Sequence, residues 1–171
     1  MRVYVPTTLN ALAQAHGTGS LGPAPLRAYA VTPALREWYL SDDIEELEYA
    51  ALVRAAQSSL RLLADDAAAP RRRVVVAVDV PDHAVELHSG AEHSDPAALG
   101  AVVLSEPLAL AKAAAVHADA DDTEVREDVA AAAAAVAAAD GGDEDARFVV
   151  DGAEDHELLW FASQEIPGLL D

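Results

Sequence analysis

The chain has 171 residues and no cysteine, and its 30 acidic and 11 basic side chains give a formal net charge of −19. Without cysteine, disulfides, thiolate metal sites and cysteine catalysis are excluded. The charge disfavours nucleic acid and anionic membrane surfaces, because both are bound by clustered Lys and Arg. The length suits one domain with its own core, so we expect a single domain over residues 1–171.

The first third of the chain predicts strands and helices in alternation. Alternating apolar side chains predict strands at Arg2–Val5 and Arg27–Thr32, and Pro6 is expected to end the first. A short helix is expected between them, followed by a loop rich in Gly and Pro over 17–25. A second short helix should begin where Thr32 precedes proline.

The clearest helix lies within residues 32–64. Asp42, followed by Glu45, is a start like a capping box. At about 100° per residue, two apolar stripes run along the helix, separated by a polar strip that includes Ala50. The first stripe contains Tyr49, Leu52, Val53, Ala56, Leu60 and Leu63; the second contains Ile44, Leu47, Ala51, Ala55 and Leu62. We therefore expect a central helix packed on two sides, by a sheet and by another helix.

The second half begins with the β-branched run Arg73–Val80, which predicts a fully buried interior strand. The polar, His-rich segment 82–100 is expected to be a mobile loop. Strands are expected at Ala101–Leu104, Lys112–Ala118 and, as a short strand, Ala146–Val150.

A helix of about 123–139 is expected between the last two of these strands, with Asp121 and Glu124 at its start. The tail over 154–170 has apolar spacings that fit both a strand and a helix at 157–166, and its acidic start favours a helix. This order of elements predicts an α/β or α+β fold, a two-layer or three-layer sandwich with a mixed sheet and a long central helix.

Two groups of side chains are candidates for a metal site, because imidazoles and carboxylates ligate zinc, manganese and iron. His83, His88 and His93 recur every five residues, a spacing that does not place neighbours on one face of a strand or helix. His117 and Asp119 would share a face of a strand. A solvated loop and the capping of the following helix are the competing interpretations.

No catalytic set is identified. The chain lacks the Gly-x-Ser-x-Gly elbow and both Gly-rich phosphate-binding fingerprints. The basic run Arg71–Arg73 is interpreted as the entrance of a strand flanked by solvent. We expect no cofactor.

Two clusters combine large aromatic with polar side chains, and either a binding pocket or the edge of a core would explain them. Arg36, Trp38 and Tyr39 form the first; Trp160, Gln164 and Glu165 belong to the second. With Tyr4, these residues are the candidate binding site.

These observations favour a non-catalytic binding or regulatory protein of the cytoplasm, with a protein partner or a second copy of the chain. The alternatives are a small metal-dependent hydrolase using His83, His88, His117 and Asp119, and a small-molecule sensor. No stretch of about 20 apolar residues could span a bilayer.

Five segments together are similar to a family of uncharacterised actinobacterial proteins. They are MRVYVPTTL, LRAYAVTPALREWY, EELEYAALVRAAQSSLRLL, RRRVVVAVDVP and the terminal DHELLWFASQEIP. The resemblance covers nearly the whole chain apart from about 82–100 and the Ala-rich helix. It implies an intracellular protein of a GC-rich Gram-positive bacterium, and it carries over no catalytic residue.

Overall fold

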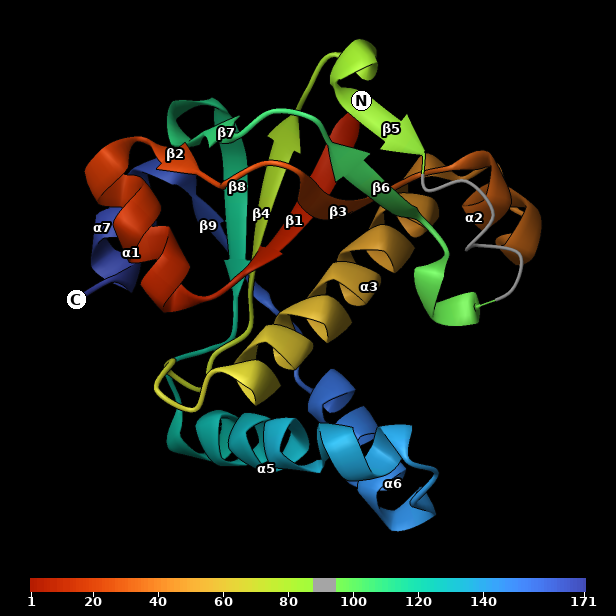
Figure 1. Ribbon diagram of the computed structural model, residues 1–171, viewed down its shortest axis with the longest axis vertical. Helices are drawn as coiled ribbons and strands as arrows, with labels where there is room; N and C mark the ends of the chain where they lie inside the picture. Colours follow the sequence, from red (N-terminus) through yellow and green to blue (C-terminus); the bar gives the residue numbers. More distant parts are fainter. Residues whose placement is uncertain (88–94) are drawn as a thin grey trace.

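The computed structural model describes residues 1–87 and 95–171, and a seven-stranded sheet forms its centre (Figure 1). The strand order is β5-β6-β3-β1-β4-β8-β9. The strands are β1 (Arg2–Thr7), β3 (Leu26–Ala30), β4 (Val74–Asp79), β5 (Val85–Leu87), β6 (Ala101–Leu104), β8 (Ala113–Ala118) and β9 (Leu159–Ala162). A second small sheet pairs β2 (Ser20–Leu21) with β7 (Leu108–Ala109).

The predicted α/β class with a long helix is confirmed, but the described strand pairings are all antiparallel instead of mixed. The topology explains the difference. A helical connection leads from β3 to β4, and these two strands do run parallel to each other. However, β1 lies between them and pairs antiparallel with both. A crossover in sequence therefore produces no parallel pair in the sheet.

Pro6 lies inside β1 and does not end it. Its partner in β4 is Val75, whereas β3 pairs with β1 only at Val3 and Tyr4. Beyond Tyr4, the β3 side of β1 is therefore an edge. Proline is tolerated there, because no neighbouring strand requires its missing N–H group.

One face of the sheet is covered by α1 (Leu9–Thr18), α7 (Ile166–Leu169) and the small sheet (Figure 1). The Thr8 hydroxyl caps α1 by accepting from the Ala11 amide at 3.2 Å. The core on this face contains valines that alternate along β1 and β4, among them Val3, Val5, Val74 and Val76. Since β4 is buried throughout Val74–Val78, the predicted interior strand is confirmed.

The other face is covered by α2 (Pro33–Tyr39) and α3 (Ile44–Asp65). As predicted, Thr32 caps α2 with Pro33 in its first turn. The cap of α3 is Asp43, one residue after the expected Asp42, and its carboxylate accepts from the Glu45 amide at 3.0 Å. The long helix packs on β1, β3 and β4 and, toward its C-terminal end, on a further helix. The predicted packing on two sides is confirmed.

The face of α3 that is buried differs from the predicted stripe. Tyr49 is 54% exposed, whereas Ala50, expected in the polar strip, is 7% exposed. Ile44 and Leu62 of the second stripe are also exposed. Small side chains explain this shift, because Ala50, Ala51 and Ala55 let the helix approach the sheet closely. The bulkier Tyr49 is turned to one side.

A helical pair, α5 (Thr123–Asp140) and α6 (Glu144–Gly152), lies beyond the C-terminal end of α3 (Figure 1). Asp122, not Asp121, caps α5. The strand expected at Ala146–Val150 is wrong, because these residues belong to α6. Asp143 caps that helix and acidic residues fill its first turn, a start that outweighs the strand preference of its two valines.

The helix expected in the tail over 154–170 is wrong at Leu159–Ala162, where β9 forms on the edge of the sheet. Trp160 is opposite His117 and Ala162 is opposite Ala115 in β8. The acidic residues that favoured a helix belong to the end of α6 and a short 3-10 turn, Ala153–Asp155. Pairing with β8 therefore decided between two patterns that the sequence left open.

The segment 82–100, expected to be a loop, contains β5 and two short 3-10 turns in the part that the structure describes. Its expected mobility and the single-domain organisation stay predictions. Among the described residues, no helix has both the length and the apolar character required to cross a bilayer.

Candidate functional site

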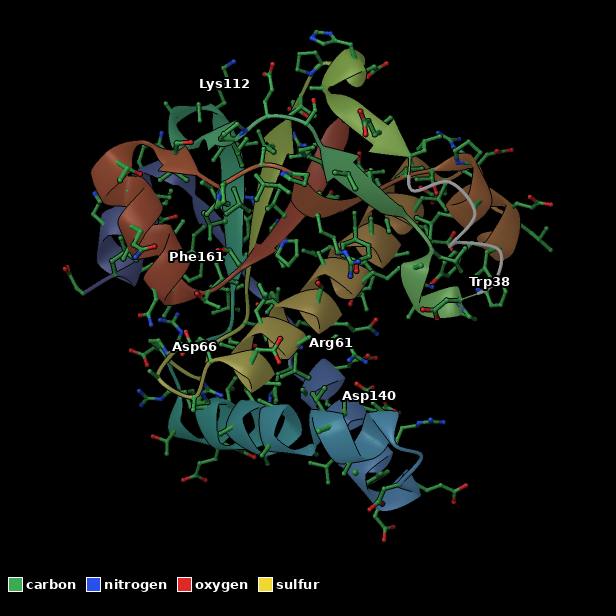
Figure 2. The ribbon with its side chains drawn as sticks, viewed as in Figure 1. Trp38, Arg61, Asp66, Lys112, Asp140 and Phe161 are labelled. Carbon is green, nitrogen blue, oxygen red and sulfur yellow. The ribbon has the colours of Figure 1, made fainter. Side chains whose placement is uncertain are left out.

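The two aromatic clusters do not converge on one pocket. Arg36 and Trp38 lie on α2, whereas Trp160 lies on the edge strand β9 and Gln164 and Glu165 follow it. Figure 2 shows Trp38 far from Phe161, the neighbour of Trp160 in β9. Trp38 and Trp160 are 60% and 62% exposed, and their side chains project from separate parts of the surface.

Three of the other candidates have positions that the structure explains. Tyr4 is buried under α3, with its ring in an edge contact with His117 at 6.4 Å between ring centres. Burial raises the pKa of Tyr4, and the nearby Glu48 carboxylate adds to the effect. Glu165 accepts from the Ala162 amide at 2.7 Å, which satisfies a backbone donor where β9 ends. Tyr39 alone of the seven candidate binding residues lines the cavity described next.

An open cavity of about 480 Å³ lies between α3 and the segment 154–158 that precedes β9. We call it the α3 groove. Its apolar lining comes from one side of α3 together with the ring of Tyr39 and Leu158. The lining consists of Tyr39, Glu46, Tyr49, Ala50, Leu52, Val53, Ala56, Arg73, Glu154, His156, Glu157 and Leu158. A mostly apolar cavity of this size with a few polar groups is typical of a small-molecule site.

Three carboxylates surround this apolar lining, and each accepts a hydrogen bond from a neutral donor. Tyr49 donates from its hydroxyl to Glu157 at 3.3 Å, and Gln57 donates from its amide to Glu154 at 2.5 Å. The hydroxyl of Ser41 donates to Glu46 at 2.9 Å. Across residues 1–87 and 95–171, none of the three forms an ion pair.

The negative charge of the groove also acts on Tyr49. Partial desolvation raises the pKa of its hydroxyl, and the carboxylates of Glu157 and Glu154 raise it further. Tyr49 therefore stays a neutral hydrogen-bond donor at ordinary pH. Its half-exposed ring forms part of the wall of the groove.

The cation in the groove is already neutralised. Arg73 contacts Asp119 twice, with 2.9 Å from Nε to Oδ2 and 2.7 Å from Nη2 to Oδ1. The side chains of this pair are 4% and 0% exposed. Asp119 also accepts from the Arg73 amide at 2.7 Å, and its carbonyl accepts from buried Arg72. We call Arg72, Arg73 and Asp119 the closed cluster.

The closed cluster corrects the view of Arg71–Arg73 as a solvent-flanked strand entrance. Arg72 and Arg73 are buried at the start of β4, and the guanidinium of Arg71 donates to the carbonyls of Leu63, Asp66 and Ala69. These arginines hold together the turn after α3 and the start of β4. They are structural cations, and all three have partners within the fold.

The imidazole of His156 also has a hydrogen-bond partner within the fold. Its Nε2 lies 2.7 Å from Oδ2 of Asp128 on α5, and its backbone carbonyl accepts from Nη2 of Arg73 at 2.7 Å. Through these contacts the segment 154–158 is anchored to both α5 and the start of β4. The wall of the groove opposite α3 is therefore fixed in place by hydrogen bonds.

The residues of the metal hypothesis that the structure describes lie apart. Exposed His83 follows the C-terminal end of β4, whereas His117 is opposite Val75 near the other end of that strand. Burial lowers the pKa of His117, and the charge of Arg2 lowers it further. Asp119 belongs to the closed cluster. His88 and His93 lie outside the described residues, and within those described no group of three or more His, Asp or Glu is arranged to hold a metal ion.

Most of the groove was missed by the sequence analysis. Tyr49 was assigned to a buried stripe, and Glu154, His156 and Glu157 were assigned to a helix. The spacing of Glu46, Tyr49 and Val53 along α3 does indicate a face that is half polar and half apolar. Its opposite wall is 108 residues away in sequence at the Tyr49–Glu157 contact, and no local pattern reveals that distance.

The fold and the groove define an α/β protein with a fixed, acidic, partly aromatic cavity beside a long helix. The chain belongs to a family of unknown function, DUF6912, whose model matches residues 1–170. No curated protein and no solved structure matches the chain.

Proposed function

We propose that the protein is a non-catalytic binding protein that holds a small ligand in the α3 groove. The observation that supports this most directly is the cavity itself, about 480 Å³ in volume with a mostly apolar lining. Its polar groups are held by hydrogen bonds, as expected of a site formed before the ligand arrives. This proposal retains the small-molecule hypothesis from the sequence, but it places the ligand between α3 and residues 154–158 and not between the two aromatic clusters.

What supports binding in preference to hydrolysis is the state of two groove residues. Arg73 is bound to Asp119 and His156 is bound to Asp128. The metal-dependent hydrolase stays an untested alternative. We propose a cytoplasmic protein of an actinobacterium, on the resemblance to actinobacterial proteins and on the lack of cysteine.

The experiment fills the groove and measures ligand binding through thermal stability. Val53→Trp places a large ring in the groove, and Ala64→Trp, at an exposed position of α3 outside it, is the matched control. A ligand that binds only the folded state stabilises it by mass action, about 2.7 kcal/mol at a hundredfold excess over its dissociation constant. Compounds from a metabolite library that stabilise the wild type and Ala64→Trp should not stabilise Val53→Trp. The proposal fails if the hits stabilise all three alike.

A second candidate function is the binding of a basic partner protein through exposed aromatic side chains. Trp38 on α2, Phe148 on α6 and Trp160 on β9 are 60%, 80% and 62% exposed. Because they lie on separate elements, each is a candidate centre of its own contact, and aromatic side chains are enriched at such centres. With a net charge of −19, a basic partner is favoured over a second copy of the chain. The test is sedimentation of the pure protein, because a stable dimer would contradict this preference.

A further inference from the structure

We infer that the α3 groove takes a small organic cation, an ammonium or guanidinium group on an apolar stem. This inference rests on the proposed function, since it names the class of ligand for the same groove. Three kinds of groups in the groove support it: carboxylates without a countercharge, aromatic rings and an apolar lining.

The first step concerns charge. Glu46, Glu154 and Glu157 come from α3 and from the opposite wall, and their hydrogen-bond donors are neutral side chains. The groove's own cation, Arg73, is held by Asp119. The rim therefore carries negative charge that the described part of the fold does not balance. The overall charge of −19 adds to the attraction for a cation and to the repulsion of an anion.

The second step concerns the rings. Tyr39 and Tyr49 border the same cavity as the three carboxylates, and both rings are partly exposed, at 39% and 54%. A cation is attracted to the face of an aromatic ring. The rings therefore add an attraction for a cation to that of the carboxylates. The Tyr49 hydroxyl is already bonded to Glu157, so the ring and that carboxylate are held next to each other.

The third step concerns the rest of the ligand. The apolar lining includes Ala50, Val53 and Ala56 of α3 and Leu158 of the opposite wall, side chains that offer no hydrogen bonds. An apolar stem would be buried against these side chains. A bare metal ion would leave the apolar lining exposed to water. An amine on a ring-sized stem would contact both the apolar lining and the carboxylates of the rim.

The test compares three probes of one shape by calorimetric titration at low salt. 2-Phenylethylamine carries the cation, 2-phenylethanol is its neutral counterpart, and 3-phenylpropionate carries an anion. We expect the amine to bind most tightly and more weakly as salt is added, because exposed charges are screened. If the neutral alcohol binds as well as the amine and Val53→Trp abolishes both, the groove stands as a site and the cationic ligand is overturned. If none of the probes binds the wild type, the cationic ligand is overturned. The proposed function fails with it only if the metabolite library also gives no compound whose binding Val53→Trp abolishes.

Variants of the rim test which groups recognise the cation. Glu157→Gln keeps a hydrogen-bond acceptor but removes the charge, and we expect a loss of amine affinity of about two- to fivefold, the size of an exposed ion pair. Glu127→Gln, at an exposed position of α5, changes the net charge equally and should have no effect. Tyr49→Leu should weaken the amine more than the alcohol. Equal losses for Glu157→Gln and Glu127→Gln would overturn the inference, because the binding would then depend on net charge alone.

A last arm distinguishes a free amine from a side chain of a protein. The peptide Gly-Gly-Lys-Gly-Gly offers the same ammonium group without a ring-sized apolar stem. We expect it to bind more weakly than 2-phenylethylamine. If the peptide binds more tightly, the occupant is a lysine of a partner protein and the small-molecule ligand is overturned.

Discussion

The closed cluster and the α3 groove lie side by side and use charge in opposite ways. In the closed cluster, Asp119 is fully buried and receives hydrogen bonds from the backbone and side chain of Arg73. In the groove, Glu46, Glu154 and Glu157 lie on the surface beside neutral donors. Arg73 belongs to both regions, because it pairs with Asp119 and also lines the groove. Arg72 and Arg73 therefore stabilise the fold through Asp119. They do not pair with the carboxylates of the groove, which stay available to a ligand.

Asp119→Ala is expected to have the largest effect. It leaves the guanidinium of Arg73 buried without its anion, and breaking a buried ion pair in this way costs about 3–5 kcal/mol. The matched control is Asp140→Ala, which removes the partner of Arg61 in a bidentate pair on the surface (Figure 2). Such a pair contributes about 1 kcal/mol or less. Urea denaturation of the variants measures both, and similar losses would contradict the distinction between a buried and an exposed pair.

Ser59→Ala is expected to have the next largest effect. The buried Ser59 hydroxyl donates to the Thr7 carbonyl at 2.7 Å and accepts from the Val74 amide at 2.9 Å. It joins α3 to the paired ends of β1 and β4. The variant leaves two buried backbone groups unsatisfied, at a cost of about 1–3 kcal/mol in the free energy of unfolding.

Ser58→Ala is the matched control for this position, because Ser58 is the preceding residue of the same helix and is only half-buried. We expect its free energy of unfolding to stay within about 0.5 kcal/mol of the wild type. If both alanine variants are equally stable, the two hydrogen bonds of Ser59 contribute nothing to joining the helix and the strands.

The sequence predicts the closed part of the molecule better than the open part, for a physical reason. Buried strands and capped helices leave local patterns, such as the valines of β4 and the threonine before Pro33. Contacts between distant segments leave none. Whether residues 159–162 form a strand depends on β8, and the burial of Arg73 depends on an aspartate 46 residues away.

The same limit applies to the candidate site. Tyr39 was identified, because an aromatic beside polar residues is a local signal. Glu157 and Glu154 could not be identified, because their role depends on Tyr49 and Gln57 of α3. The two tryptophans were selected for their size, and they lie on separate parts of the surface. A groove between two segments is visible only once the segments are placed together.

A pH-dependent effect is expected from His117, whose ring contacts the buried ring of Tyr4 under α3. Because its folded-state pKa is lowered by burial, the unfolded chain binds a proton more readily than the folded protein. Stability contributed by neutral His117 is therefore present above its ordinary pKa of 6.5 and lost as the pH falls through the folded-state value.

The measurement compares the wild type with His117→Gln by thermal denaturation between pH 7.5 and pH 5. The variant should gain in stability relative to the wild type as the pH falls, because it has no imidazole to protonate. Carboxylates common to both proteins cancel in the difference. A constant difference over this range would contradict the linkage.

The smallest effect on the free energy of unfolding is expected from removing two carboxylates of the groove. The double variant Glu154→Gln, Glu157→Gln keeps both acceptors, so the donors Gln57 and Tyr49 keep their partners. Because the two carboxylates are exposed and form no ion pair within the described residues, their charges contribute little to folding. At a net charge of −19, removing two negative charges also relieves repulsion.

Urea denaturation should give a free energy of unfolding within about 0.5 kcal/mol of the wild type. A loss well above that would mean that these carboxylates stabilise the fold, as Asp119 does, and would remove the contrast on which the ligand site depends.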